Sequence, residues 1–162
     1  EFSSQPDQIG RTQQDLWQKA MNAINVKIEF RIAKWPEQLK QSRAGKLMMW
    51  GVAWAATTPD GDRFLALGYG PNKGAANHSR FDLPAFNALY IKQNKMPVMP
   101  DGPEREALMR DAKQLSIVYM PYKISAHRIA TDLMHPQLVG YKRHPFMREW
   151  WRYVDIEATL PQ

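Results

Sequence analysis

Two carboxylates stand close together in a turn that follows a long apolar stretch. Asp60 and Asp62 are separated only by Gly61. Two acids at short range can serve as a general acid and a general base, which would suit a hydrolase. An Asp just before a helix can also cap that helix by accepting a backbone N–H, and a short helix is expected after this turn. Capping is the simpler prediction for Asp60, and hydrolysis by both carboxylates is an alternative.

Other residue types that commonly perform chemistry are absent from the sequence or scattered along it. The chain has no cysteine, which excludes disulfides, thiolate zinc sites and cysteine nucleophiles. Its four histidines do not show the clustered spacing of a metal site, so no metal is predicted. No G-x-S-x-G motif, phosphate loop or dinucleotide fingerprint occurs, so no cofactor is predicted. We therefore expect a protein that is not an enzyme.

Two tryptophans point to binding rather than to catalysis. Both lie in the apolar run over residues 47–55, and Trp54 stands three residues before the Thr-Thr-Pro-Asp turn. Trp50 is predicted to be a core residue. In open α/β sheets, ligands bind at the carboxyl ends of strands, and large flat side chains are common in binding pockets. Residues 54–60 therefore occupy the place where a ligand is expected.

The elements around this run follow an α/β pattern. An apolar stripe over residues 12–24 predicts a helix, and Asn25 suits the left-handed cap that would end it. Apolar and charged residues alternate over 26–32, which predicts a strand with one buried face. The run 47–55 is apolar on both faces, as in a parallel strand that is covered by helices. Residues 33–46 are long enough for a right-handed crossover with a short helix, so a β-α-β unit is predicted.

The rest of the chain gives weaker patterns. We expect helices over 63–68, around 86–91 and from Pro103 onward, and strands over 120–127 and 137–141. Residues 145–156 are rich in aromatic side chains and fit either a helix or a strand.

The net charge leaves one alternative function open. The chain has 22 Lys and Arg against 16 Asp and Glu, a formal charge of +6. A small basic nucleic-acid-binding domain would gather these cations on one face, whereas here they are scattered, so a solvated surface and no nucleic acid are predicted. No apolar run reaches the ~18 residues that a membrane span needs. The first six residues also lack a signal-peptide pattern.

The order of motifs resembles the extracellular solute-binding proteins of family 5, the dipeptide, oligopeptide and nickel receptors of ABC importers. The run AINVKIE at 23–29 is similar to the family's helix-to-strand junction, and WPEQL at 35–39 to its next short helix. Trp54 followed by PDGDRFL at 59–65 is similar to a strand that closes on a tryptophan before a Pro-Asp-Pro-Asp-Asn-Phe-Leu turn. The run NHSRFDLPAFNAL at 77–89 resembles the family pattern Asn-Tyr-x-x-Tyr-x-Asn-Pro-x-Phe-Asp-x-Leu.

The resemblance covers about residues 10–156 and implies an α/β fold. The chain would form part of the second lobe of a type II periplasmic-binding-protein fold, with a mixed sheet flanked by helices. Family members are much longer than 162 residues, so the resemblance implies a C-terminal fragment. Residues 1–144 would then belong to the second ligand-binding lobe, and residues 145–162 to a tail that returns to the first lobe. The implied location is the periplasm, or the outer cell surface with an anchor through a missing N-terminus.

The implied function is capture of a small solute or peptide between two lobes and its delivery to the permease subunits of an ABC transporter. The ligand-binding residues would be Trp54, Ala55, Ala56 and Thr57, with Asp60 as a further candidate. Peptide receptors of this family carry an Asp three residues after the tryptophan, where it holds the ligand's α-ammonium group. Thr57 stands there in this sequence, and a neutral hydroxyl is a poor partner for a buried ammonium. The resemblance thus supports uptake without implying a peptide.

Overall fold

A three-stranded parallel sheet organises the first fifty residues of the chain. The computed structural model describes residues 1–94, 99–127 and 129–157. Strand β1 (Phe2–Ser4) lies in the middle of the sheet, between β2 (Phe30–Ile32) and β3 (Met49–Trp50). Both neighbours run parallel to β1, with Phe2 opposite Phe30 on one side and opposite Met49 on the other. Residues near the start of the chain therefore join the two strands that the alternating and apolar patterns predict.

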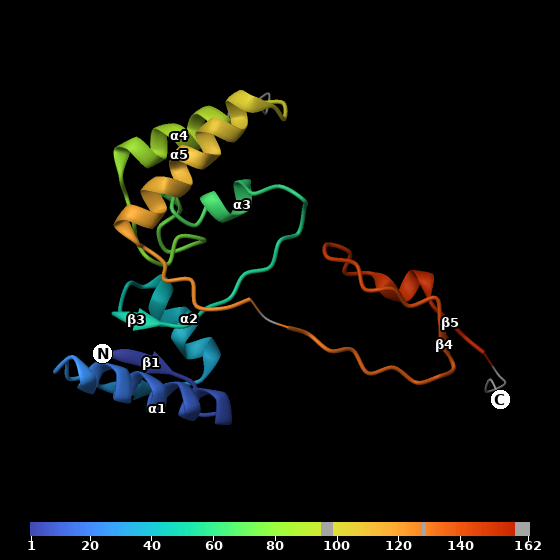
Figure 1. Cartoon of the computed structure of the whole chain (residues 1–162), viewed down its shortest axis with the longest axis horizontal. Helices are drawn as coiled ribbons and strands as arrows, with labels where there is room; N and C mark the ends of the chain where they lie inside the picture. Colours follow the sequence, from blue (N-terminus) through green and yellow to red (C-terminus); the bar gives the residue numbers. More distant parts are fainter. Residues whose placement is uncertain (95–98, 128, 158–162) are drawn as a thin grey trace.

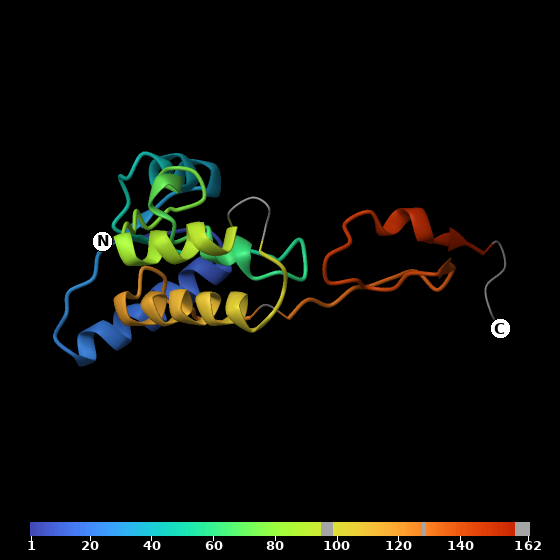
Figure 2. The ribbon, with the colours of Figure 1, turned by 90° about the horizontal axis from the view of Figure 1, so that it is seen from above.

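Two helices flank this sheet and end where the sequence predicts. Helix α1 (Gln8–Ala23) begins four residues earlier than expected, because the Asp7 carboxylate accepts the Gly10 N–H at 2.6 Å and caps it. Asn25 takes the predicted left-handed conformation, with φ of 56°. Helix α2 (Trp35–Arg43) lies on the other side of β1 from α1 (Figures 1 and 2).

A buried amide ties α2 to the sheet. The side-chain Nε2 of Gln38 donates to the backbone oxygens of Ser4, at 2.7 Å, and Ala33, at 2.8 Å. Gln38 is almost fully buried, so these two bonds satisfy donors that would otherwise be costly to remove from water. The two hydrogen bonds hold α2 at the carboxyl ends of β1 and β2.

The predicted long strand over residues 47–55 is wrong in its length and burial. Only Met49 and Trp50 pair with a neighbour, and Met48 and Met49 are 77% and 42% exposed. Because β3 lies at the edge of the sheet, one side of its backbone has no partner strand among the described residues. The strand predicted over 26–32 is likewise reduced to its last three residues, 30–32.

A helical hairpin packs beyond the sheet and contains most of the apolar core. Helices α4 (Pro84–Asn94) and α5 (Pro103–Tyr119) lie side by side, with the short helix α3 (Asp62–Leu65) against them (Figures 1 and 2). A 3₁₀ turn, η1 (Gly70–Asn72), precedes the hairpin. Phe86, Leu108 and Ala112 are buried between these elements. The helices expected near 63–68, near 86–91 and from Pro103 are thus confirmed.

Residues 129–157, called the arm below, extend away from this body (Figures 1 and 2). In the arm, β4 (Leu138–Val139) pairs antiparallel with β5 (Asp155–Ile156), after a 3₁₀ turn, η2 (Trp150–Tyr153). The strand expected over 137–141 is confirmed in shortened form. The strand expected over 120–127 is wrong, because those residues follow the left-handed cap of α5 at Met120 and pair with no described strand.

Candidate functional site

An aromatic cluster forms where the chain leaves β3. Trp54 lies edge-on to Tyr122, with ring centroids 5.3 Å apart and planes at 87°, and its ring is 6.1 Å from that of His78. Trp50 is 5.3 Å from His78 and 5.4 Å from Trp35. Trp35 and Trp54 are each 37% exposed, and the other three members are partly buried. The cluster is therefore anchored inside and open to solvent at two indoles.

The hydroxyl group of Tyr122 joins this cluster to two loops. It accepts the backbone N–H of His78 at 3.0 Å and that of Ser79 at 3.2 Å, and it donates to the Leu67 carbonyl oxygen at 3.1 Å. Sequence reasoning did not find Tyr122, because it lies in an irregular segment with no periodic pattern. Its partners are all distant in sequence, so no local signal could have found it.

His78 lies inside the cluster, where its surroundings disfavour the charged imidazolium. Its Nδ1 is 2.9 Å from the hydroxyl oxygen of Ser42. Burial lowers the pKa of His78, and the nearby positive charge of Arg43 lowers it further. The neighbouring Asn77 is fully buried and its amide donates to the backbone oxygens of Tyr69 and Phe81, which fixes the loop that carries His78.

The predicted residues after Trp54 continue along this edge as irregular backbone. Ala55 is exposed, while Ala56 and Thr57 are partly buried. The Thr57 hydroxyl oxygen is buried and has no hydrogen-bond partner among the described residues. Thr57 also lines a pocket of about 580 Å³ together with Arg63 and residues 146–149 of the arm. The structure thus brings Trp54 to Thr57 together at one surface.

Asp60 is placed differently, because its carboxylate is already occupied. One oxygen accepts the Asp62 N–H at 3.0 Å, and the other is 2.7 Å from the guanidinium of Arg105, whose side chain is only 6% exposed. Burial alone would raise the pKa of Asp60, but the hydrogen bond from the Asp62 amide and the Arg105 charge outweigh it and lower that pKa. Asp60 thus accepts the first N–H of α3, but the N-cap position of that helix is Gly61 and no side chain caps it, so capping by Asp60 is not confirmed. Neither Asp60 nor Asp62 lines the pocket beside Thr57 or the pocket within the arm, and neither pocket therefore supports a two-carboxylate hydrolase.

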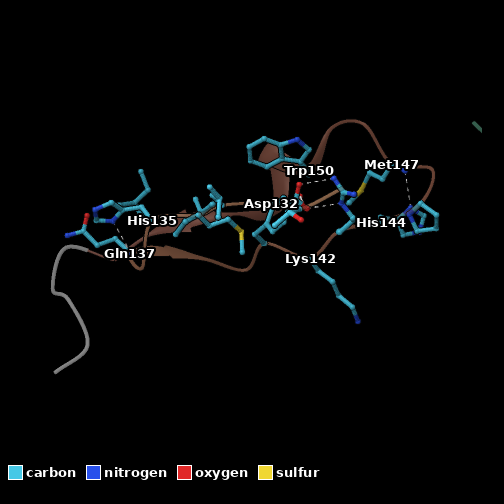
Figure 3. A pocket seen from close by; sticks show the side chains of 15 residues that line it. Asp132, His135, Gln137, Lys142, His144, Met147 and Trp150 are labelled. Atoms are coloured by element: carbon cyan, nitrogen blue, oxygen red, sulfur yellow. Dashed lines mark hydrogen bonds and ion pairs between the residues drawn. The ribbon is translucent and has the colours of Figure 1, made fainter. Parts of the chain in front are cut away.

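A second pocket, of about 820 Å³, lies within the arm (Figure 3). Its central acid is Asp132, which binds Arg143 through both oxygens at 2.7 Å and accepts the Tyr141 hydroxyl at 2.8 Å. These contacts, the Tyr141 hydrogen bond first, lower the pKa of Asp132. His135 and His144 lie at opposite ends of the view in Figure 3. In the described ranges, no three His, Cys, Asp or Glu side chains gather closely enough to hold a metal ion.

Comparisons with known proteins give one curated relative and two solved structures that we describe in turn. No family model matches the chain. The chain is 26% identical over 144 residues to the di/tripeptide-binding protein 2 of Pseudomonas aeruginosa (strain UCBPP-PA14), which covers 88% of this chain and 26% of that protein. The chain therefore spans about a quarter of the length of this curated relative.

Two solved structures share the fold. One is the ABC transporter-associated periplasmic binding protein DppA from Helicobacter pylori in complex with the peptide STSA, with a TM-score of 0.61 and 24% identity over 75% of this chain and 24% of that chain. The other is HbpA2 from Haemophilus parasuis, with a TM-score of 0.68 and 18% identity over 96% of this chain and 32% of that chain. The predicted α/β fold of periplasmic binding proteins is thereby confirmed.

Proposed function

We propose that this chain, a part-length relative of the extracellular solute-binding proteins of family 5, belongs to the substrate-binding component of an ABC importer. A substrate-binding role is supported by the name of the Pseudomonas relative and by the peptide in the Helicobacter structure. The proposal extends this role to uptake, in which a peptide-like or other small solute is captured in the periplasm and passed to a membrane permease. Among the residues that the structure describes, no helix is long and apolar enough to cross a membrane.

The observation that carries the proposal is the partly exposed Trp54, which lies four residues after the carboxyl end of the parallel strand β3. Its ring is supported from behind by Tyr122 and His78, and 37% of the side chain stays open to solvent. A supported flat ring at this edge of a parallel sheet is suited to pack against an apolar or planar part of a ligand. We assign ligand contacts to Trp54, Ala55, Ala56 and Thr57, and give Asp60 the role of holding the turn below them through Arg105.

In this proposal the ligand lies between two lobes, of which the chain supplies a part. Residues 1–144 would belong to the second lobe and residues 145–162 to a tail that returns to the first, although 158–162 lie outside the described residues. The chain spans a quarter to a third of the length of the proteins that it matches, so a longer receptor has room for the opposing lobe. The large exposed apolar side chains of the arm, such as Ile129 and Leu133, are consistent with a surface that such a lobe would cover.

The test is calorimetry on a receptor of the relatives' length that contains this chain, titrated with di- to pentapeptides. Replacing Trp54 with Ala should weaken binding at least tenfold, because a buried aromatic contact commonly contributes more than about 1.4 kcal/mol. Leu16→Ala is the matched control, since Leu16 is an exposed apolar residue on α1, away from the cluster. If both variants bind like the parent, the assignment of the site to Trp54 is wrong; if no peptide binds, a peptide is not the ligand.

A further inference from the structure

We infer that Tyr122 is a positioning residue that fixes the orientation of Trp54 for ligand binding, an inference that rests on the proposed function. The two residues come from different parts of the chain. Trp54 follows the edge strand β3, whereas Tyr122 follows α5 and the left-handed cap at Met120. Their contact therefore links the sheet to the helical hairpin at the point where the proposed ligand-contacting segment begins.

The first part of the argument is the geometry of the two rings. The edge-on arrangement, with planes at 87° and centroids 5.3 Å apart, directs one ring edge onto the face of the other. This arrangement is favourable because the positive ring edge meets the negative ring face. Rotation of the Trp54 side chain would break this contact, so the ring of Tyr122 favours one orientation of the indole.

The second part of the argument is that the hydroxyl of Tyr122 has no remaining capacity. A phenol has one donor and two acceptor positions, and here it donates to Leu67 and accepts from His78 and Ser79. These bonds anchor Tyr122 itself and also the backbone of His78. Because the His78 ring contacts Trp54 as well, Tyr122 controls the indole from two sides, once directly and once through the loop.

The consequence for binding is pre-organisation. A large side chain that is already held in its bound orientation loses little freedom when a ligand packs on it. The open part of Trp54 would then be a rigid surface, selective for a ligand group that fits its fixed plane. Without Tyr122 the indole would sample several rotamers, and the same contact would be weaker.

The structural part is tested by NMR on the 162-residue chain, and it needs no ligand. Tyr122→Phe keeps the ring, so the indole N–H signal of Trp54, assigned with Trp54→Phe, should stay near its position. The amides of His78 and Ser79 should then exchange with solvent about tenfold faster, because they lose their acceptor. Tyr122→Leu should also shift the indole signal. Tyr153→Phe, at an exposed tyrosine in the arm, is the control and should change neither readout.

The functional part uses the longer receptor and trialanine as the probe. Tyr122→Leu should weaken binding about tenfold, and Tyr122→Phe should fall between it and the parent. If the parent binds neither trialanine nor N-acetyl-trialanine, the peptide-like ligand of the proposed function is wrong while the NMR result still stands. The inference is overturned if the indole signal and both amides are unchanged in Tyr122→Leu, or if that variant shifts the indole and still binds trialanine like the parent.

Discussion

The carboxylate of Asp60 and the guanidinium of Arg105 lie 2.7 Å apart, although the two residues are separated by 45 positions in the sequence. The contact joins the turn after β3 to the first turn of α5. Arg105 has a second partner, Asp101, at 2.6 Å, but the Asp101 side chain is 93% exposed whereas that of Asp60 is 34% exposed. Asp60 is thus the partner of Arg105 that is better shielded from solvent.

Replacing Asp60 with Asn should lower the free energy of unfolding by about 2 kcal/mol, the range of a hydrogen bond to a charged group. The cost arises because a nearly buried guanidinium loses its better-shielded counter-charge. Asp101→Asn is a matched control on the same arginine and should cost less than about 1 kcal/mol, because exposed ion pairs contribute little. Urea unfolding of both variants measures the difference. Equal losses would show that the burial of Asp60 does not matter.

The stabilisation by Asp60 should depend on pH in a defined direction. Its pKa is lower in the folded chain than the ordinary value of about 3.9, so the ionised form favours folding. The ionised Asp60 makes its full contribution to the free energy of unfolding above the pKa that it has in the unfolded chain. That contribution is lost as the pH falls through the pKa of Asp60 in the folded chain. The stability gap between the parent and Asp60→Asn should therefore be largest at neutral pH and should close as the pH falls through the folded pKa. A gap that stays constant would contradict this assignment.

His78 should make stability depend on pH in a higher range. Burial, and then the charge of Arg43, lower its pKa below the ordinary value of about 6.5, so the folded state disfavours the proton. The free energy of unfolding should be highest above pH ~6.5, where His78 is neutral in both states. It should fall as the pH drops from there toward the folded pKa, because the unfolded chain binds the proton first. His78→Gln removes the titration and keeps a polar partner for Ser42. Unfolding measured at pH 7.5 and at pH 5.5 should show a larger drop for the parent than for the variant.

Gly68→Ala should destabilise the helical hairpin through a steric clash. A Cβ at position 68 would lie 2.7 Å from the Phe86 ring, which is fully buried and has little room to move. Overpacking of this kind costs about 1–3 kcal/mol. Gly51→Ala is the control, because no atom lies within 4 Å of its added Cβ. Adding Phe86→Leu to Gly68→Ala should recover part of the loss. A thermal shift as small as that of the control would mean that the ring moves aside without cost.

Thr57 leads to a prediction about the ligand. Of the carboxylates near it among the described residues, Asp60 is bound to Arg105, and Glu149, which lines the same pocket, is paired with Arg152. Peptides with an acetylated amino terminus should therefore bind the longer receptor at least as well as free peptides, since an unpaired buried ammonium is costly. A thermal-shift screen with di- to pentapeptides and their acetylated forms compares the two. Tight binding that acetylation destroys would show that another acid replaces the missing one.

Local patterns in the sequence predicted the helices well. Asn25, Pro36 and Pro103 mark helix ends through their own backbone preferences, so their effects do not depend on the rest of the fold. The fold class also followed from periodicity and from the resemblance to a known family, whereas Trp54 lies four residues beyond β3 and not within the strand predicted over 47–55. Whether Trp54 to Thr57 bind a ligand stays a prediction.

Features that depend on distant contacts were missed. Nothing in the residues around Phe2 indicates a strand, because β1 is three residues long and exists only through its two neighbours. Arg105 and Tyr122 look like ordinary surface residues in the sequence, and only the folded chain shows that one is buried and the other links two loops. The apolar run around Met49 predicted burial, whereas an edge strand has no partner on one side to provide it.

The central place of β1 has a consequence for synthesis on the ribosome. Phe2–Ser4 emerges before both of its partners, so it must wait until Phe30 and then Met49 have been translated. During that interval neither of these two partner strands is available, and α1 is a neighbouring element that can form beside it from local sequence alone. Slower translation between residues 5 and 50 would lengthen this interval. Nascent chains of this protein should therefore be most sensitive to chaperone depletion before β3 has left the exit tunnel.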